Sequence, residues 1–313
     1  MSEAGEFRRV AIVGVGLIGA SFGAAIQKAR PGISIVGYDK PEVLRKLRDV
    51  QSEWETPRDL GVAVRDADLI YIALPVAATI EVLPQIALQC DSRALVTDAG
   101  STKTRICKAA KKVFGDGAKF LGGHPIAGRE LGGLEHANPE LFRGRRYALI
   151  SDEGAERDEN DSRVKQFVEF VRAIGAEPTW IDAETHDWAV AVVSQMPQMV
   201  AIALARVISD ETDETGLPGS LAGNGLRNLL RIAGSPYEVW RDICVTNAEN
   251  IARSLDRAAQ AIDFLRTHLT CRELEKEFAD ANEVYKMLRE MDSAPDGEEG
   301  RADEQMKRSG ADG

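Results

Sequence analysis

His124 stands in a glycine-rich segment, Gly122-Gly123-His124-Pro125-Ile126-Ala127-Gly128-Arg129-Glu130, that predicts a tightly turned loop. An imidazole, whose ordinary pKa is about 6.5, can take a proton from a hydroxyl while a hydride leaves the same carbon. Ser101 is a second polar group, in Asp98-Ala99-Gly100-Ser101-Thr102-Lys103. Both residues follow predicted strands, so we expect them at the carboxyl edge of one sheet. The pair predicts proton transfer in a redox reaction.

Both side chains also have a purely structural interpretation. Ser101 could cap a helix predicted over residues 102–114, a role that is compatible with catalysis. His124 could instead be a buried loop histidine whose ring is satisfied by backbone groups. The flanking glycines and proline favour the catalytic interpretation.

A glycine turn near the N-terminus predicts a site for a dinucleotide. It follows a β-branched run over residues 8–13, typical of a buried strand, and precedes a predicted helix over residues 17–28 whose N-terminus can bind phosphate. Gly14 allows the turn, Gly16 lets the backbone approach a pyrophosphate, and Gly19 lets helix and strand pack closely. The predicted cofactor-binding residues are Gly14, Gly16, Leu17, Ile18 and Gly19, with Pro75 and Ser101 after two later strands.

Asp39 indicates which dinucleotide binds. It ends a second predicted strand over residues 33–38 and lies 20 residues after Gly19. A carboxylate at this spacing accepts hydrogen bonds from an adenosine ribose and repels a 2′-phosphate. The alternative, that Asp39 only caps a helix starting at Pro41, does not explain its register with the glycines. The sequence therefore predicts NAD rather than NADP.

The chain has 313 residues, enough for roughly two domains. Strands and helices alternate up to residue 181, which predicts an α/β fold with a Rossmann-type doubly wound sheet. Apolar residues then recur at helical spacing in three long stretches, 184–210, 219–232 and 236–268. We predict an NAD-binding domain over residues 1–182, an all-α substrate and dimerisation domain over 183–290, and a disordered charged tail over 291–313. Helices with this much apolar surface predict a homodimer.

Composition excludes several classes of protein. The net charge of −11 argues against nucleic acid and anionic membranes as partners. No uninterrupted apolar run reaches the roughly 20 residues of a membrane span, and the polar start predicts no signal peptide. Four scattered cysteines predict reduced thiols and no metal site. Together these features predict a cytoplasmic enzyme that acts on a small molecule.

The order of the motifs resembles the prephenate and arogenate dehydrogenases of tyrosine biosynthesis. The resemblance spans residues 8–270 and is carried by the glycine turn, by GSTK at 100–103 and HPIAGRE at 124–130, and by RIA at 231–233 and WRDI at 240–243. It implies an oxidative decarboxylation, in which a hydride passes from the hydroxyl-bearing ring carbon to NAD, carbon dioxide leaves and the ring becomes aromatic. Prephenate would give 4-hydroxyphenylpyruvate, and arogenate would give tyrosine.

The resemblance also implies roles for single residues. His124 would draw the proton from the ring hydroxyl, and Ser101 would orient both groups. Arg231 would bind a substrate carboxylate, which suits an arginine fork, although an exposed helix arginine is the alternative. The other implied substrate contacts are Glu130 at the mouth of the site, Trp240 near the arginine, Arg227 across a dimer interface, and Ser194 and Gln198 around Pro197.

Three positions depart from the pattern of this family. Gln195 and Gln198 stand where many relatives carry histidine, and Arg129 stands where relatives often have a small hydroxyl residue. A glutamine amide can donate to a keto acid or accept from an ammonium, so it does not choose between prephenate and arogenate. We favour prephenate because Asp39 and the bacterial-style loop go together in this family, and arogenate stays open.

Two other functions fit part of the sequence. Dehydrogenases of the β-hydroxyacid and 6-phosphogluconate type use a catalytic lysine on a helix of the second domain, but no lysine occurs between Lys165 and Lys276. A non-catalytic NAD-binding regulatory protein would explain the absent histidines. Ser101, His124 and Arg231 argue for catalysis instead.

Overall fold

A computed structural model of the chain describes residues 7–115, 117–128, 132–151, 160–212 and 216–292. Its centre is a seven-stranded sheet in the order β2-β1-β3-β4-β5-β6-β7. The strands are β1 (Arg9–Val13), β2 (Ser34–Tyr38), β3 (Leu69–Ile72), β4 (Leu95–Asp98), β5 (Lys119–Pro125), β6 (Arg146–Ile150) and β7 (Glu177–Ile181). Neighbouring strands are parallel except for β5 and β6, an antiparallel pair that the sequence analysis did not foresee.

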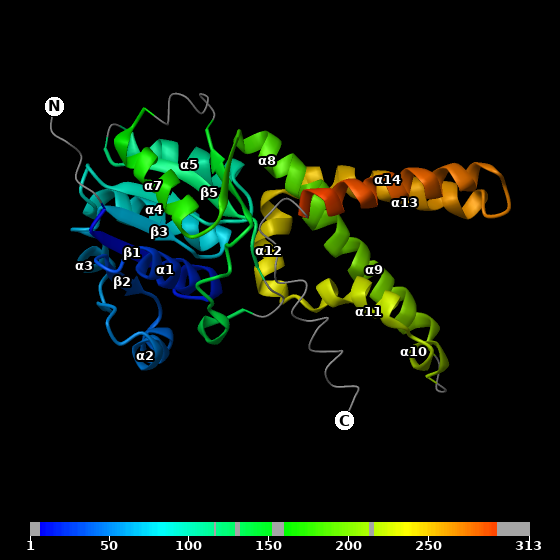
Figure 1. Cartoon of the computed structure of the whole chain (residues 1–313), viewed down its shortest axis with the longest axis horizontal. Coiled ribbons are helices and arrows are strands. Elements are labelled where there is room, and N and C mark those ends of the chain that lie inside the picture. Colours follow the sequence, from blue (N-terminus) through cyan, green and yellow to red (C-terminus); the bar gives the residue numbers. More distant parts are fainter. Residues whose placement is uncertain (1–6, 116, 129–131, 152–159, 213–215, 293–313) are drawn as a thin grey trace. The chain divides into compact units, whose positions relative to one another are not determined.

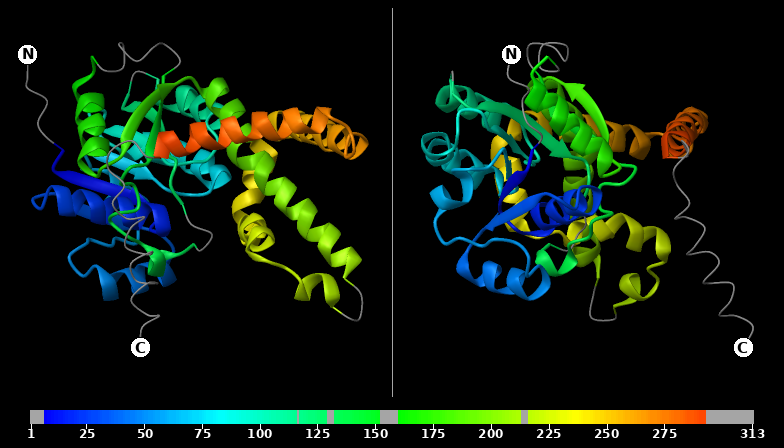
Figure 2. Two further views of the ribbon diagram at one scale, coloured as in Figure 1. Left: turned by 45° about the vertical axis from the view of Figure 1, so that its right-hand side comes forward. Right: turned by 60° about the vertical axis from the view of Figure 1, so that its left-hand side comes forward.

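Helices cover both faces of this sheet (Figures 1 and 2). On one face lie α1 (Leu17–Ala29) and α7 (Ser162–Ala173), and on the other lie α3 (Leu60–Val64), α4 (Val76–Gln89) and α5 (Thr104–Phe114). Strand β3 shows why both faces are buried, because its successive residues point in opposite directions. Tyr71 stacks on Phe22 of α1 with ring centroids 3.7 Å apart, whereas Ile70 joins the opposite core. The doubly wound prediction is confirmed.

After β7 the chain is helical, but its helices are shorter than the sequence predicted. They are α8 (Ala183–Val190), α9 (Met196–Glu211), α10 (Leu217–Ser220), α11 (Asn224–Arg231), α12 (Tyr237–Thr246), α13 (Ala248–Thr267) and α14 (Glu273–Asp292). A π-helical turn, Ala191–Gln195, separates α8 from α9. The prediction of one helix over 236–268 is wrong, because the helix is interrupted at Asn247. The buried side chain of Asn247 donates to the backbone oxygen of Asp187 and to the Oε1 of Gln195.

By its internal contacts the chain divides into two compact units, Met1–Leu255 and Asp256–Gly313. The first unit contains the whole sheet and the helices as far as α12, and the second contains the end of α13 and all of α14. The domain boundary near residue 182 stays a prediction. The predicted tail lies outside the described residues from residue 293 onward.

Within the first unit, two buried carboxylates join α8 and α12 to the N-termini of α5 and α4, two of the helices that cover the sheet. Asp187 of α8 accepts the backbone N–H groups of Lys103 (2.7 Å) and Thr104 (2.9 Å) at the start of α5. Asp242 of α12 accepts the N–H of Ala77 (3.0 Å) at the start of α4. Neither helix is capped by the side chain of its own N-cap residue, so these distant acids cap them. The interpretation of Ser101 as the cap of α5 is therefore wrong.

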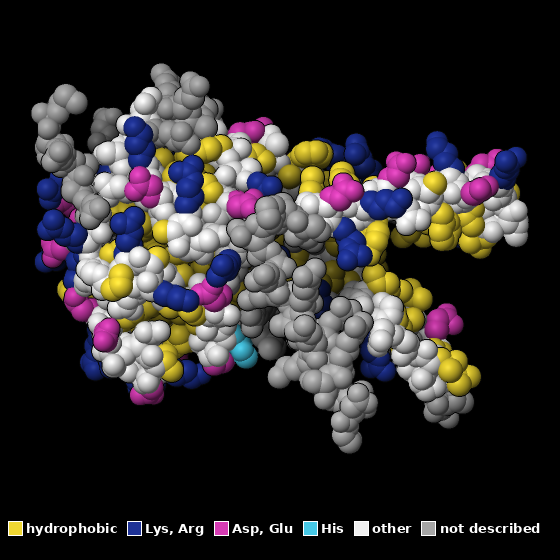
Figure 3. All heavy atoms as spheres, in the orientation of Figure 1, with side chains coloured by type: hydrophobic (Ala, Val, Ile, Leu, Met, Phe, Trp, Pro, Cys, Tyr) yellow, Lys and Arg dark blue, Asp and Glu magenta, His cyan; other side chains and the backbone are white. Residues whose placement is uncertain are grey.

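One stretch, Ala183–Glu211, is long and apolar enough by length and composition to cross a membrane, although the sequence analysis found no such run. Its first residues bind α5 through Asp187. Ile202 and Val207 of α9 are 45% and 56% exposed, and Figure 3 shows apolar side chains at the surface along this helix. The stretch thus bonds to the start of α5 at one end and exposes apolar side chains along α9.

Candidate active site

The glycine turn between β1 and α1 leaves room for a ligand. Gly14 has a φ of +98°, and a Cβ added there would lie 2.5 Å from the carbonyl oxygen of Ala73. A Cβ on Gly19 would lie 1.9 Å from the carbonyl oxygen of Gly14, so helix and turn can pack this closely only without side chains. A Cβ on Gly16 would meet nothing within 4 Å. The first turn of α1, all of it described, contains no acidic residue.

Asp39 lies directly after β2 and supports this turn. One carboxylate oxygen accepts the N–H of Val15 at 2.7 Å, and the other accepts the N–H of Lys40 at 2.6 Å. Helix α2 (Pro41–Val50) has Lys40 as its N-cap and no side-chain cap, so Asp39 does not cap it. Each carboxylate oxygen accepts two hydrogen bonds in ordinary geometry, which leaves acceptor capacity for ribose hydroxyls. The glycine turn and Asp39 therefore fit a dinucleotide.

His124 lies on a strand and not on the loop that the sequence predicted. Residues 122–125 form the end of β5 and pair antiparallel with β6, where His124 faces Ala148. A Cβ on Gly123 would lie 2.7 Å from the carbonyl oxygen of Asp98. The glycine before His124 thus serves the close approach of β5 to the end of β4.

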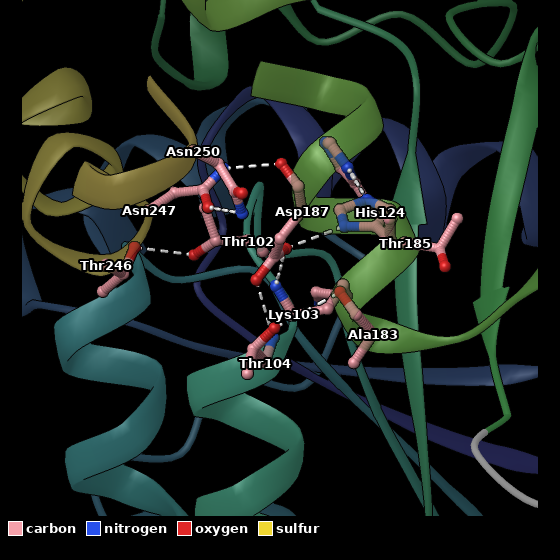
Figure 4. A network of polar contacts seen from close by, with 12 residues as sticks. Thr102, Lys103, Thr104, His124, Ala183, Thr185, Asp187, Thr246, Asn247 and Asn250 are labelled. Carbon is pink, nitrogen blue, oxygen red and sulfur yellow. Dashed lines mark hydrogen bonds and ion pairs between the residues drawn. The ribbon is translucent and has the colours of Figure 1, made fainter. Parts of the chain in front are cut away.

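Two further residues connect His124 to α8 (Figure 4). The Nδ1 of His124 lies 2.9 Å from the Nε2 of His186, and the Nδ1 of His186 lies 2.9 Å from the Oδ1 of Asp187. The His186 and Asp187 side chains are buried, whereas His124 is half-buried. The Nδ1 of His124, at the end of β5, is therefore hydrogen-bonded to His186 of α8.

The surroundings of His124 keep its ring neutral. Burial lowers the pKa of His124 well below its ordinary value, and the nearby His186 and Lys103 lower it further. The neutral imidazole is the form that can accept a proton. His124 therefore meets the protonation requirement of a general base.

A fully buried ion pair fixes the ends of β4 and β5. The ammonium of Lys103 bonds to the carboxylate of Asp98 and donates to the carbonyl oxygen of Gly123 at 2.6 Å. Asp98 also accepts the N–H groups of Gly100 (2.8 Å) and Gly123 (3.3 Å). The loop that carries Ser101 lies between these two ion-pair residues, and Ser101 itself is half-buried. The pair therefore tethers the Ser101 loop to the strand that carries His124.

The predicted substrate residues other than Glu130 lie on the helical elements that follow β7. Arg227 and Arg231 of α11 line an open hollow of about 400 Å³, together with the apolar residues Ile208, Leu226 and Leu230. Trp240 of α12 is half-buried and packs against a small core of Ala191, Ile243 and Ile251. Glu130, like Arg129, lies outside the described residues.

The polar residues around Pro197 differ in their surroundings. Ser194 is exposed in the π-helical turn. Gln195 is buried, and its Oε1 accepts a hydrogen bond from Asn247 Nδ2 at 2.8 Å. Gln198 is also buried, but its Nε2 has no hydrogen-bond partner among the described residues. The amide of Gln195 thus stabilises the fold, and the buried Nε2 donor of Gln198 stays unpaired among the described residues.

Two domains of one enzyme family match this chain in order. The prephenate dehydrogenase nucleotide-binding domain matches residues 22–179, and the prephenate dehydrogenase dimerization domain matches residues 182–289. The chain belongs to the prephenate dehydrogenase family. The Rossmann-type fold, NAD as cofactor and an NAD-dependent dehydrogenase of the prephenate and arogenate type are thereby confirmed.

Among the proteins similar to this chain, some are named prephenate dehydrogenases and one is named an arogenate dehydrogenase. A prephenate dehydrogenase from Lactococcus lactis subsp. cremoris is 31% identical over 268 residues, which cover 85% of this chain and 72% of the relative. The crystal structure of prephenate dehydrogenase from A. aeolicus with hydroxyphenyl propionate and NAD⁺ has a TM-score of 0.80, 27% identity, and coverage of 92% and 99%. A Synechocystis arogenate dehydrogenase structure has a TM-score of 0.74, 26% identity, and coverage of 90% and 99%.

Four residues of the network were not predicted from the sequence: Asp98, Lys103, His186 and Asp187. Asp98 and Lys103 are the two ends of the quoted segment Asp98-Ala99-Gly100-Ser101-Thr102-Lys103 but received no role. His186 is one of only four histidines in the chain and is followed directly by an acid, just after the last strand. An imidazole next to a carboxylate, directly after the last strand, was the sequence signal that could have indicated these two residues.

Proposed function

We propose that this protein catalyses the NAD-dependent oxidative decarboxylation of prephenate to 4-hydroxyphenylpyruvate, with arogenate as the alternative substrate. The observation that carries the proposal is the neutral, half-buried imidazole of His124 at the end of β5, beside the Ser101 loop. The related A. aeolicus enzyme, whose structure holds NAD⁺ and hydroxyphenyl propionate, supports the same class of substrate.

The glycine turn and Asp39 hold the dinucleotide in this proposal. Gly14, Gly16 and Gly19 leave the N-terminus of α1 open to a pyrophosphate, with Leu17 and Ile18 forming the first turn of the helix. Asp39 accepts the ribose hydroxyls, and Pro75 and Ser101 follow β3 and β4 at the same sheet edge. When bound, NAD supplies the hydride acceptor.

His124 carries the proton chemistry. Its imidazole takes the proton of the ring hydroxyl as the hydroxyl-bearing carbon gives up its hydride. The bond to the ring carboxylate then breaks, carbon dioxide leaves, and the electron pair of that bond makes the ring aromatic. The proton returns from His124 to the phenol oxygen, so that no proton is released overall. Ser101 orients the hydroxyl and the imidazole.

Arg231 and Gln198 hold the substrate in the proposal. Arg231 pairs with a carboxylate, with Arg227, Trp240, Ser194 and Glu130 as further contacts around the same substrate. The Nε2 of Gln198 is a buried donor without a partner among the described residues. A keto oxygen can accept from this Nε2, and the Oε1 of the same amide can accept from an ammonium, so Gln198 fits either substrate.

Four initial-rate assays test the proposal: prephenate and arogenate, each with NAD and with NADP. We expect the highest kcat/KM with prephenate and NAD. A higher value with arogenate would replace the substrate assignment by the alternative. The absence of reduced cofactor in all four assays would leave a non-catalytic NAD-binding protein.

Substitution of Asp39 should change the choice of cofactor. A charge about 4 Å from a 2′-phosphate is worth about 1–4 kcal/mol, so Asp39→Ser should raise the NADP to NAD ratio of kcat/KM by about 5- to 1,000-fold. Asp49→Ser is the matched control, because Asp49 is exposed on α2. Equal use of the two cofactors by the wild type would refute the role of Asp39.

Substitution of Arg231 should affect binding more than chemistry. Loss of a charged hydrogen-bonded partner costs about 1.5–3 kcal/mol, so Arg231→Ala should raise the substrate KM by about 10- to 100-fold with a smaller fall in kcat. Arg231→Lys should recover only part, because an ammonium cannot form the two parallel bonds of the fork. Arg172→Ala, at an exposed position of α7, is the control. An unchanged KM in Arg231→Ala would place the carboxylate site elsewhere.

A homodimer formed through the helical stretch is part of the proposal, as is a cytoplasmic location. Residues 182–289 match a dimerization domain. Exposed apolar side chains along α9 and α11, such as Val207 and Leu229, supply the surface that a second copy would cover.

A further inference from the structure

We infer that His186 and Asp187 are positioning residues that fix His124 in the tautomer with its proton on Nδ1, leaving Nε2 bare to receive the substrate proton. The inference rests on the proposed function, because it assigns the proton-accepting atom of that reaction. It follows from the chain of contacts His124, His186 and Asp187 (Figure 4).

The direction of the chain is set by Asp187. Its carboxylate accepts the N–H groups of Lys103 and Thr104 and lies 2.9 Å from the Nδ1 of His186. Burial raises the pKa of Asp187, but hydrogen bonds from His186, Thr104 and Lys103 outweigh burial and leave it lowered. An ionised carboxylate only accepts hydrogen bonds. The Nδ1 of His186 must therefore carry the proton.

That proton determines the next link. A neutral imidazole has one N–H, so a proton on the Nδ1 of His186 leaves its Nε2 as an acceptor. The Nδ1 of His124 lies 2.9 Å from this Nε2 and must donate to it. The single proton of His124 is then on Nδ1, and its Nε2 is bare. Neutral histidine in water prefers the opposite tautomer, so the protein imposes the form that a base at Nε2 requires.

Charged groups face this pair of imidazoles from several elements. Lys103, at the start of α5, faces the imidazoles with its positive charge, and Asp98 of β4 pairs with that lysine. From α8 come His186 and Asp187, and Asn247 adds an uncharged amide that donates to the backbone oxygen of Asp187. A proton added to His186 would make its Nε2 a donor and would reverse the tautomer of His124. The proposed tautomer therefore requires an uncharged ring at His186, and the hydrogen-bond chain holds only in that form.

The second role of Asp187 explains why a carboxylate is needed. Both of its oxygens face N–H donors of α5, and one also faces His186. In Asp187→Asn, an NH₂ group would point at one of these donors or would donate to His186 and reverse the chain. The same acid thus caps α5, next to the Ser101 loop, and orients the base.

Nitrogen NMR of the wild-type protein tests the tautomer directly. The chain has four histidines, His124, His136, His186 and His268, so uniform ¹⁵N-histidine labelling gives four rings to assign. His124→Asn and His268→Gln samples identify two of them, and His186→Gln identifies a third. We expect His124 and His186 both to carry their proton on Nδ1 near neutral pH. A proton on the Nε2 of His124 would overturn the inference.

Kinetics provide the second readout. His186→Leu cannot accept from His124 and should lower kcat by about 10- to 100-fold with little change in substrate KM. His186→Gln should recover part of this loss, because its amide can accept from His124 and donate to Asp187. In His186→Leu the acid limb of kcat/KM should move to lower pH, because no neutral Nε2 then accepts from His124 Nδ1 and stabilises the protonated ring. His268→Gln should match the wild type.

Different results would reject the proposed function and the positioning role of His186 and Asp187. An Nδ1-protonated His124 in a wild type that reduces NAD with neither substrate would reject the proposed function and retain the tautomer. An active wild type whose His186→Leu variant keeps the wild-type kcat and pH profile would retain the function and reject the positioning role.

Discussion

Replacement of His124 by asparagine is expected to lower kcat by about 100- to 10,000-fold, the usual range for a lost general base. Asparagine has no group that takes a proton near neutral pH, although its amide retains some hydrogen bonding to the His186 side of the network. The residue lies on β5, away from the glycine turn between β1 and α1, so the affinity for NAD should change only modestly. Steady-state kinetics and a fluorescence titration with NAD measure the two effects.

His268→Asn is the matched control for that substitution, because His268 lies after α13 in the second compact unit. It should retain wild-type kcat. Near wild-type turnover in His124→Asn would show that another group accepts the proton. A large loss of NAD affinity would instead place His124 in cofactor binding.

The Lys103→Met substitution is expected to lower the free energy of unfolding by about 3–5 kcal/mol, because it leaves a buried carboxylate without its counter-charge. The side chains of Lys103 and Asp98 are both fully buried. Methionine fills similar volume, so the loss comes from the unpaired charge and from the hydrogen bond to Gly123. Urea denaturation followed by circular dichroism measures the change.

Two further variants isolate the ion pair. Lys108→Met removes an exposed lysine from the same helix and should change stability by less than about 0.5 kcal/mol. The double variant Lys103→Met with Asp98→Asn should recover part of the loss, because no charge is then buried. A Lys103→Met variant as stable as Lys108→Met would mean that the pair contributes nothing.

Much of the fold was predictable from local patterns. The β-branched runs and the glycine turn predicted the strands and their order of alternation with helices, since these signals depend on neighbouring residues. The prediction of one helix over 236–268 was wrong because the side chain of Asn247 bonds to Asp187 and Gln195, which are distant in sequence. The glycines before His124 gave a loop signal, yet pairing with β6 makes them part of a strand.

The candidate site was predictable only where one segment carries the signal. His124, Ser101 and the glycine turn each stand in a short motif. His186 lies 62 residues from His124, and their contact exists only because α8 returns to the carboxyl edge of the sheet. The caps of α4 and α5 were missed for the same reason, since Asp242 and Asp187 come from later helices. Long-range polar contacts of this kind leave no periodic trace in a sequence.

The stoichiometry of the wild-type reaction with prephenate and NAD tests the proposed oxidative decarboxylation. NADH is followed by absorbance, carbon dioxide by trapping, and 4-hydroxyphenylpyruvate by chromatography. We expect the three products to form in equal amounts, and we expect the His124→Asn variant to form all three at the same reduced rate. Release of carbon dioxide without NADH, or no product from either prephenate or arogenate, would contradict the proposed reaction.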